Sequence, residues 1–183
     1  MQGLVRAFVA VRVQGRVADV LDNFLAEIRP LANIRWVRRE QFHITLKFLG
    51  ELEANVIAQV KDALEPMKYF DPFVIELDHI GAFPNLASPR VLWLAGDKGS
   101  SELGRLARKV DDVLSEKVGL EREVKKFRAH LTLARLKEGR LPEVLVRRLA
   151  DVPDLSFECR ELVLMRSQLT PRSEVHTSEL QSR

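Results

Sequence analysis

The chain has 183 residues, of which 46% are hydrophobic and 30% are charged, a balance typical of one globular domain with a sizeable core. The single cysteine, Cys159, excludes an internal disulfide and a cysteine-rich metal site, and no apolar run approaches the roughly 20 residues that span a bilayer. The beginning of the chain lacks a secretory cleavage signature, so we expect a cytoplasmic protein.

Strand and helix patterns alternate along the first half of the chain. Residues 4–13 predict a strand, and the apolar positions of 17–28 follow helical spacing. Two further strands are expected at 36–37 and 42–49, and a helix is expected over 56–64. The pattern therefore predicts that the first half is an α/β unit, without the glycine-rich turn of a nucleotide-binding motif.

The second half shows a similar alternation. We predict strands at 73–77, 91–94 and 162–165, helices at 103–114 and 144–149, and another strand that begins near residue 130. Cys159 has apolar neighbours and is expected to be a buried strand residue. We expect residues 1–172 to form a single domain and the polar residues 173–183 to form a weakly ordered C-terminal tail.

One four-residue pattern occurs twice, as HITL at 43–46 and as HLTL at 130–133. Residues two apart share a face of an extended strand, so each His projects beside its Thr while the aliphatic residues point to the buried face. Four His and four Thr in the whole chain would rarely form this pattern twice by chance. The weaker interpretation is that each His is an ordinary strand-edge residue and each Thr only a good strand former.

The two tetrads begin 87 residues apart, which is nearly half the chain and suggests an internal duplication. Two α/β lobes related by a pseudo-twofold axis would bring their motif strands together. Two His and two Thr would then surround one cleft, within reach of one substrate.

Two imidazoles suit a reaction that needs a base and an acid in one turnover, because one can be neutral while the other is protonated. Phosphodiester cleavage fits this need, since Thr hydroxyls can bind phosphate oxygens and a guanidinium can offset the developing charge. We expect Arg135, five residues beyond His130, to share the face of the His and to reach the edge of the cleft. A paired-histidine zinc site is disfavoured because carboxylates and cysteines are missing at ligand spacing.

Basic residues precede both tetrads, and they suit a substrate that bears phosphate. The clusters are Arg35, Arg38 and Arg39 before the first tetrad, and Lys125, Lys126 and Arg128 before the second. The alternative is that each cluster is an ordinary solvated face.

HITLKFLG at 43–50 and HLTLARL at 130–136 resemble the two signatures of the two-histidine (2H) phosphoesterases. Within that superfamily, the chain most resembles the RNA 2′,3′-cyclic phosphodiesterases, historically called 2′-5′ RNA ligases. The segments that carry this resemblance are RAFVAV, GAFPN followed by PRVLWLA, LARKVDDVL, and LVLMRSQLTPR. The resemblance implies a bilobal α/β (α+β) fold, with antiparallel-type sheets flanked by helices and an active-site cleft between the lobes. It also implies hydrolysis of a terminal 2′,3′-cyclic phosphate of RNA to a 2′-phosphate without a metal or cofactor.

Carried over to this sequence, the resemblance makes His43 and His130 the acid/base pair. Thr45 and Thr132 would bind the phosphate, and Arg135 would add charge stabilisation. The expected partner is an RNA 3′ end with a 2′,3′-cyclic phosphate, handled by a monomer that needs neither a membrane nor another protein.

Three other functions stay open. The same groups could run the reverse reaction, which joins the cyclic phosphate to a 5′-hydroxyl. The substrate could instead be a small cyclic nucleotide or an ADP-ribose cyclic phosphate, or the chain could be a non-catalytic module that binds RNA ends.

Aromatic residues and the two remaining histidines allow less specific predictions. Phe48, Trp36 and Phe83 could stack on a base, although buried packing is favoured for Phe48 and Phe83. We expect His79 and His176 to be surface histidines.

Overall fold

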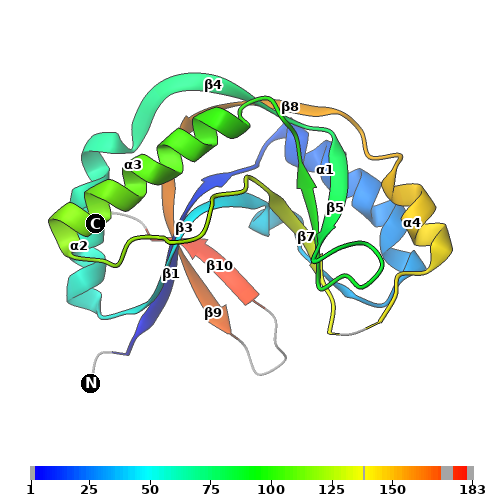
Figure 1. The fold of residues 1–183 in the computed structure, drawn as a ribbon, viewed down its shortest axis with the longest axis horizontal. Helices are drawn as coiled ribbons and strands as arrows, with labels where there is room; N and C mark the ends of the chain where they lie inside the picture. Colours follow the sequence, from blue (N-terminus) through cyan, green and yellow to red (C-terminus); the bar gives the residue numbers. More distant parts are fainter. Residues whose placement is uncertain (1–2, 138, 170–174, 181–183) are drawn as a thin grey trace.

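The computed structural model describes residues 3–137, 139–169 and 175–180 (Figure 1). Its first half contains β1 (Val5–Arg12), α1 (Arg16–Ile28), β2 (Arg35–Trp36), β3 (His43–Leu52) and α2 (Ala54–Leu64). Its second half contains β4 (Tyr69–Leu77), β5 (His79–Phe83), β6 (Val91–Ala95), α3 (Ser100–Val118), β7 (Leu131–Arg135), α4 (Glu143–Leu149), β8 (Leu155–Glu161), β9 (Val163–Leu169) and β10 (Val175–Glu179). Short 3-10 turns occupy Arg29–Leu31, Arg39–Gln41 and Glu65–Met67.

The strands form an antiparallel sheet in the order β10-β9-β1-β3-β7-β6-β5, with β2 added beside β7. β4 and β8 form a separate two-stranded sheet. The larger sheet has two arms, β10-β9-β1-β3 and β7-β6-β5, which meet where Ile44 of β3 pairs with Leu131 of β7. The predicted α/β class with antiparallel sheets flanked by helices is therefore confirmed, and the two arms are joined through the tetrads themselves.

Helices cover one face of both arms (Figure 1). α2 and α3 pack together over the first arm, whereas α1 and α4 lie over the second, where Arg148 contacts Glu27 at 2.9 Å. α1 begins directly after β1 of the first arm but covers the second. Its buried residues, Leu21, Leu25 and Ile28, recur at the three-to-four-residue spacing of one helix face. Each arm is therefore stabilised by a helix from the other half of the chain.

The main hydrophobic core lies between the sheet and these helices. Ile44 and Leu131 are fully buried in it. A smaller cluster on the other face of the first arm contains Phe8, Ala10 and Met165. Within the described residues no helix is long and apolar enough to cross a membrane.

Each tetrad ends in a β-bulge. In the β1–β3 pairing, Ala10 is opposite Thr45 and Val9 is opposite Lys47, so Leu46 is an extra residue. In the β6–β7 pairing, Trp93 is opposite Thr132 and Leu92 is opposite Ala134, so Leu133 is extra. An extra residue reverses the alternation of side chains beyond it. Both strands therefore change which residues face the core directly after the tetrad.

The first bulge explains why the expected buried packing of Phe48 is wrong. Regular alternation would place Phe48 on the core side together with Leu46. The bulge instead turns Lys47 toward the core, and Phe48 is 62% exposed on the other face, with its ring 6.1 Å from that of Phe8. Phe83 is half buried, as the packing interpretation expects, and contacts the rings of Trp93 and His130.

Part of the expected C-terminal tail is a strand. Residues 175–179 form β10, which pairs with β9 from Val175 opposite Leu169 to Glu179 opposite Met165. Hairpin pairing with β9 satisfies backbone groups that the polar composition alone would leave to solvent. Residues 173, 174 and 181–183 lie outside the described residues, as do the surroundings of the His176 side chain, so its surface position stays a prediction.

Candidate active site

The two tetrads cross at one point of the sheet. Ile44 pairs with Leu131, and both side chains point into the core. Because side chains alternate along a strand, His43 and Thr45 on either side of Ile44, and His130 and Thr132 on either side of Leu131, lie on the face away from the core. We call this face the tetrad face.

Each histidine is anchored to the backbone in the same way. Nδ1 of His43 lies 2.6 Å from the carbonyl oxygen of Gln41, and Nδ1 of His130 lies 2.8 Å from that of Arg128. A carbonyl oxygen can only accept a hydrogen bond, so Nδ1 carries the proton in both rings. In the neutral imidazole Nε2 is then a free base, and in the protonated imidazole it is an acid.

The surroundings of both imidazoles lower their pKa. For His43 the largest cause is burial, opposed by the bond to Gln41 and reinforced by the charges of Arg135 and His130. For His130 the causes are burial, again opposed by its backbone bond, and the charge of Arg135. The ring of His130 and the guanidinium of Arg135 thus both act on His43, as residues of one site would.

An aromatic ring flanks each imidazole. The ring of Phe8 from β1 lies 4.8 Å from that of His43, and the ring of Phe83 from β5 lies 5.2 Å from that of His130, edge to face. Beyond Phe83, Trp93 lies at 5.3 Å. These rings hold the imidazoles in place and remove water from one side, which accounts for the burial that lowers their pKa.

The two threonines are half buried beside the histidines. Within the described structure neither Thr45 nor Thr132 has a side-chain hydrogen bond. Their hydroxyl groups can therefore serve a ligand on the tetrad face.

The second bulge brings Arg135 to the tetrad face. Residues five apart on a regular strand point to opposite sides, so alternation alone would turn Arg135 away from His130. The extra Leu133, whose carbonyl accepts a hydrogen bond from the N–H of Val37 at 2.8 Å, restores the shared face. The charge of Arg135 then reaches both imidazoles. The expected placement holds, but the bulge is its cause.

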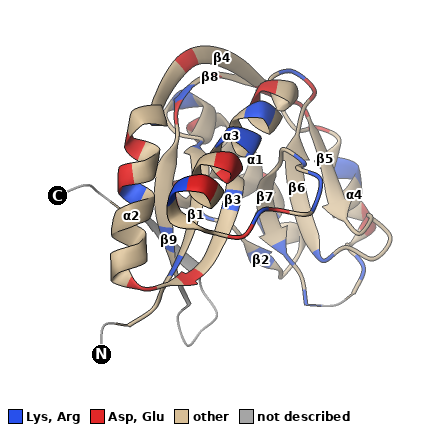
Figure 2. Cartoon of the chain, turned by 60° about the vertical axis from the view of Figure 1, so that its left-hand side comes forward, with Lys and Arg blue, Asp and Glu red and all other residues tan. Residues whose placement is uncertain are grey.

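The basic residues upstream of the tetrads differ in whether their charge is available to a ligand. Arg39 is held by Asp19 at 2.7 Å, so its charge is already paired. Arg35 is the Cα partner of Arg135 on the neighbouring strand. Elsewhere, both signs of charge alternate along the outer helices α2 and α3, as Figure 2 shows.

Trp36 is half buried, with its indole N–H directed at the carbonyl of Ala32 at 3.3 Å, which favours a structural role.

A sequence model of the 2′-5′ RNA ligase superfamily matches residues 17–171. The chain belongs to this superfamily. The family expected from the two tetrads, that of the 2H phosphoesterases, is therefore confirmed, and with it the expectation that the chain is an enzyme.

Relatives within the 2′-5′ RNA ligase superfamily cover nearly all of the chain. The RNA 2′,3′-cyclic phosphodiesterase of Archaeoglobus fulgidus is 38% identical over 93% of this chain and 96% of its own length. The protein of the same description from Aeropyrum pernix is 36% identical over 88% of this chain and 91% of its own.

Solved structures share the fold. The TT0787 protein of Thermus thermophilus aligns with a TM-score of 0.76 at 27% identity, covering 96% of this chain and 95% of its own. LigT of E. coli aligns with the same TM-score at 21% identity, over 98% of this chain and 96% of its own.

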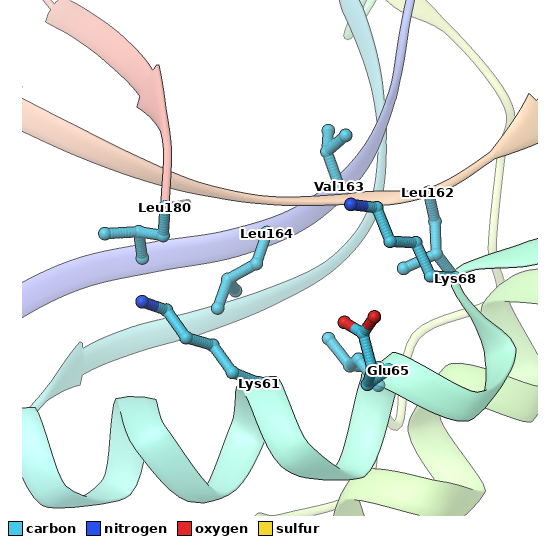
Figure 3. Close-up of a pocket in the computed structure, with 8 residues that line it drawn as sticks. Lys61, Glu65, Lys68, Leu162, Val163, Leu164 and Leu180 are labelled. Carbon is cyan, nitrogen blue, oxygen red and sulfur yellow. The ribbon is translucent and has the colours of Figure 1, made fainter. Parts of the chain in front are cut away.

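Two hollows lie among the described residues. One is lined by Phe48, Gly50, Leu120 and Val124, beside the segment that leads to the second tetrad. The other lies between α2 and β9, where Lys61, Glu65 and Lys68 surround it (Figure 3). Neither holds a residue of the tetrads.

Other chemistry-bearing groups lie outside the tetrad face. Cys159 is buried on β8, as expected, and burial raises the pKa of its thiol to about 12, so the thiol stays protonated at neutral pH. His79 is exposed, as expected, and contacts Asp78 at 2.8 Å. Among the described residues no three His, Cys, Asp or Glu side chains gather as a metal site would require.

Sequence reasoning missed Phe8 as the residue that packs on His43. Phe8 stands in the apolar run of β1, where strand periodicity alone cannot separate a core residue from one on the tetrad face. Its only signal is its register opposite Phe48, which becomes visible once β1 and β3 are paired.

Proposed function

We propose that this protein hydrolyses the terminal 2′,3′-cyclic phosphate of RNA to a 2′-phosphate by a two-histidine acid/base mechanism. One observation carries the proposal: two imidazoles, each held through Nδ1, present Nε2 on the same face beside two threonines and Arg135. The relatives described as RNA 2′,3′-cyclic phosphodiesterases support this substrate.

The reaction needs two proton transfers. Nε2 of the neutral histidine takes a proton from water as the water oxygen attacks phosphorus. Nε2–H of the protonated histidine gives its proton to the 3′ oxygen as the P–O3′ bond breaks, which leaves a 3′-hydroxyl and a 2′-phosphate. The two histidines exchange protonation states in each turnover, and solvent restores them.

The remaining groups bind the phosphate. Thr45 and Thr132 donate hydrogen bonds to its non-bridging oxygens, and Arg135 offsets the negative charge that grows in the transition state. An anionic phosphate also raises the pKa of an adjacent imidazole, so substrate binding favours the singly protonated pair that the reaction needs. No metal or cofactor takes part in these steps.

Several features suit an RNA end. Phe48 offers an exposed aromatic face on which a base can stack, beside Phe8 and His43. Both histidines come from one chain, so a monomer suffices and no protein partner is needed. We place the activity in the cytoplasm. By microscopic reversibility the same groups also join a cyclic phosphate to a 5′-hydroxyl as a 2′-5′ linkage.

The direct test is to incubate the purified protein, in excess chelator, with a short RNA that ends in a 2′,3′-cyclic phosphate. We expect a 2′-phosphate product from the wild type and its loss by about 10²–10⁴-fold in His43→Ala and His130→Ala. The exposed His79, changed to Ala, is the matched control and should keep wild-type turnover.

Each other outcome has a defined meaning. Full turnover by His43→Ala would refute the two-histidine mechanism. Turnover of a mononucleoside or ADP-ribose cyclic phosphate but not of RNA would favour the small-nucleotide alternative. Tight binding of the RNA end without turnover would favour a non-catalytic binding module.

A further inference from the structure

Three arginines from both arms of the sheet converge beside the histidines. Arg35 of β2 and Arg135 of β7 are Cα partners on neighbouring strands, so their side chains share the tetrad face. Arg6 of β1 points to the same face as Phe8, two residues further along this strand, whose ring contacts His43. Arg6 thus extends from the first arm, and Arg35 and Arg135 from the second.

The three guanidinium groups lie near enough to repel one another. The pKa of Arg135 is lowered, mainly by burial and then by the charges of Arg35 and Arg6. Like charges directly opposite each other in a sheet are destabilising, so this arrangement works against folding. An anionic ligand that binds the three arginines would offset this repulsion, which gives the cluster a role that folding alone does not.

No described side chain forms an ion pair with this cluster of Arg6, Arg35 and Arg135. The carboxylate that stands opposite Arg6 in the strand register is Glu51, and it makes no ion pair with Arg6. As far as the described residues go, the three positive charges have no ion-pair partner, and an external anion can bind them.

The cluster extends outward from the reacting phosphate. Of the three arginines, Arg135 alone lies on a tetrad strand, two residues beyond Leu133. Arg35 lies on the neighbouring strand, and Arg6 lies on β1 two residues from Phe8, whose ring contacts His43. Arg6 and Arg35 thus form the outer pair of the cluster. A cyclic phosphate carries a single negative charge, so a second phosphate is needed to match the outer pair.

We propose that Arg6 and Arg35, together with the outer side of Arg135, bind the phosphodiester one nucleotide upstream of the cyclic phosphate in an RNA chain. This inference rests on the proposed function and adds a second phosphate site to it. Planar guanidinium groups suit such a site because they bind phosphate oxygens in pairs. The enzyme then prefers an oligonucleotide to a mononucleoside 2′,3′-cyclic phosphate.

The test compares kcat/KM for a dinucleotide that ends in a 2′,3′-cyclic phosphate with kcat/KM for the mononucleoside cyclic phosphate. We expect the wild type to prefer the dinucleotide. In Arg6→Gln and Arg35→Gln this preference falls by about tenfold, mainly through KM, and the salt dependence for the dinucleotide becomes less steep. Arg108→Gln, which removes an exposed charge from the outer helix α3, is the matched control and leaves the preference unchanged.

Two further measurements separate the possible failures. Calorimetry measures the binding of a dinucleotide that ends in a 2′-phosphate and of the corresponding mononucleotide, without turnover. Tighter binding of the dinucleotide would support the second phosphate site even if the protein does not hydrolyse the cyclic phosphate. Thermal unfolding of Arg35→Gln should occur no lower than in the wild type, because the change removes repulsion. Equal losses on both substrates, or none on either, would overturn the second phosphate site.

Discussion

At the scale of single residues, the two histidines share two features. Each donates Nδ1–H to the carbonyl of the residue two positions earlier, and each lies against a phenylalanine. The backbone contact recurs because each tetrad begins with a histidine that follows the accepting residue by two positions. Neither ring is paired with a carboxylate within the described residues, so in the proposed mechanism the negative charge that stabilises a protonated imidazole comes from the substrate.

This environment predicts the pH dependence of the reaction. Both histidines have a pKa below the ordinary value of 6.5 in the free protein, chiefly because of burial. Since kcat/KM requires one imidazole protonated and the other neutral, it should peak below pH 6.5 and decline as the pH rises further. The measurement is kcat/KM between about pH 4.5 and 9 at constant ionic strength.

The shape of that profile is as informative as its position. Paired roles require a bell with two limbs. A single limb would contradict the paired roles, and a maximum above neutral pH would contradict the lowered pKa values of the free protein.

At the scale of elements, the bulges mark the limit of what the sequence reveals. The tetrads and their strands are predictable because His and Thr alternate with buried aliphatic residues. The reversal after Leu46 and Leu133 is not, since both residues fit the apolar pattern equally well with or without a bulge. This is why the predicted burial of Phe48 is wrong. It is also why the sequence does not reveal that a bulge brings Arg135 to the tetrad face.

The first bulge also creates a buried ion pair. Lys47 turns toward the core, where Nζ lies 2.6 Å from Asp111 of α3 and 2.8 Å from the carbonyl of Glu121. Burial alone would raise the pKa of Asp111, but hydrogen bonds from Lys47 and from the N–H of Glu123 lower it. This network fixes the segment after α3, which leads to the second tetrad.

Removing Lys47 should therefore destabilise the fold. In Lys47→Met the Asp111 carboxylate, whose side chain is only 15% exposed, loses its ion-pair partner, and we expect the free energy of unfolding to fall by about 3 kcal/mol. Denaturation with urea measures the change. The control is Lys98→Met, which breaks the exposed pair with Glu76 and should cost less than about 1 kcal/mol. Equal losses in the two variants would show that the buried pair has no special importance.

At the scale of the whole molecule, the two arms of the sheet meet at the two tetrads. The spacing of the tetrads predicts two related lobes, and the structure joins them through Ile44 and Leu131. The crossing of α1 to the opposite arm was not predictable from its amphipathic pattern. That pattern specifies a buried face but not the arm against which the face packs.

The pairing of Ile44 with Leu131, which we call the joint, should set the geometry of the site. Ile44→Ala and Ile75→Ala each remove a fully buried side chain, the first at the joint and the second in the separate β4–β8 sheet, and both should cost about 3 kcal/mol of stability. We expect kcat/KM to fall about tenfold or more only in Ile44→Ala, because a small displacement of one arm misplaces one histidine. The assay is run where both variants remain folded, and equal kcat/KM in the two would argue against this role of the joint.

The central claim is that histidines from both halves act as one catalytic unit. The measurement that tests it most directly is the single-turnover rate of cyclic-phosphate hydrolysis in the wild type, His43→Ala, His130→Ala and the double variant. Residues that act as a unit give losses that do not multiply, so the double variant should be about as slow as either single variant. Losses that multiply, or a single variant that keeps a rate near that of the wild type, would contradict the claim.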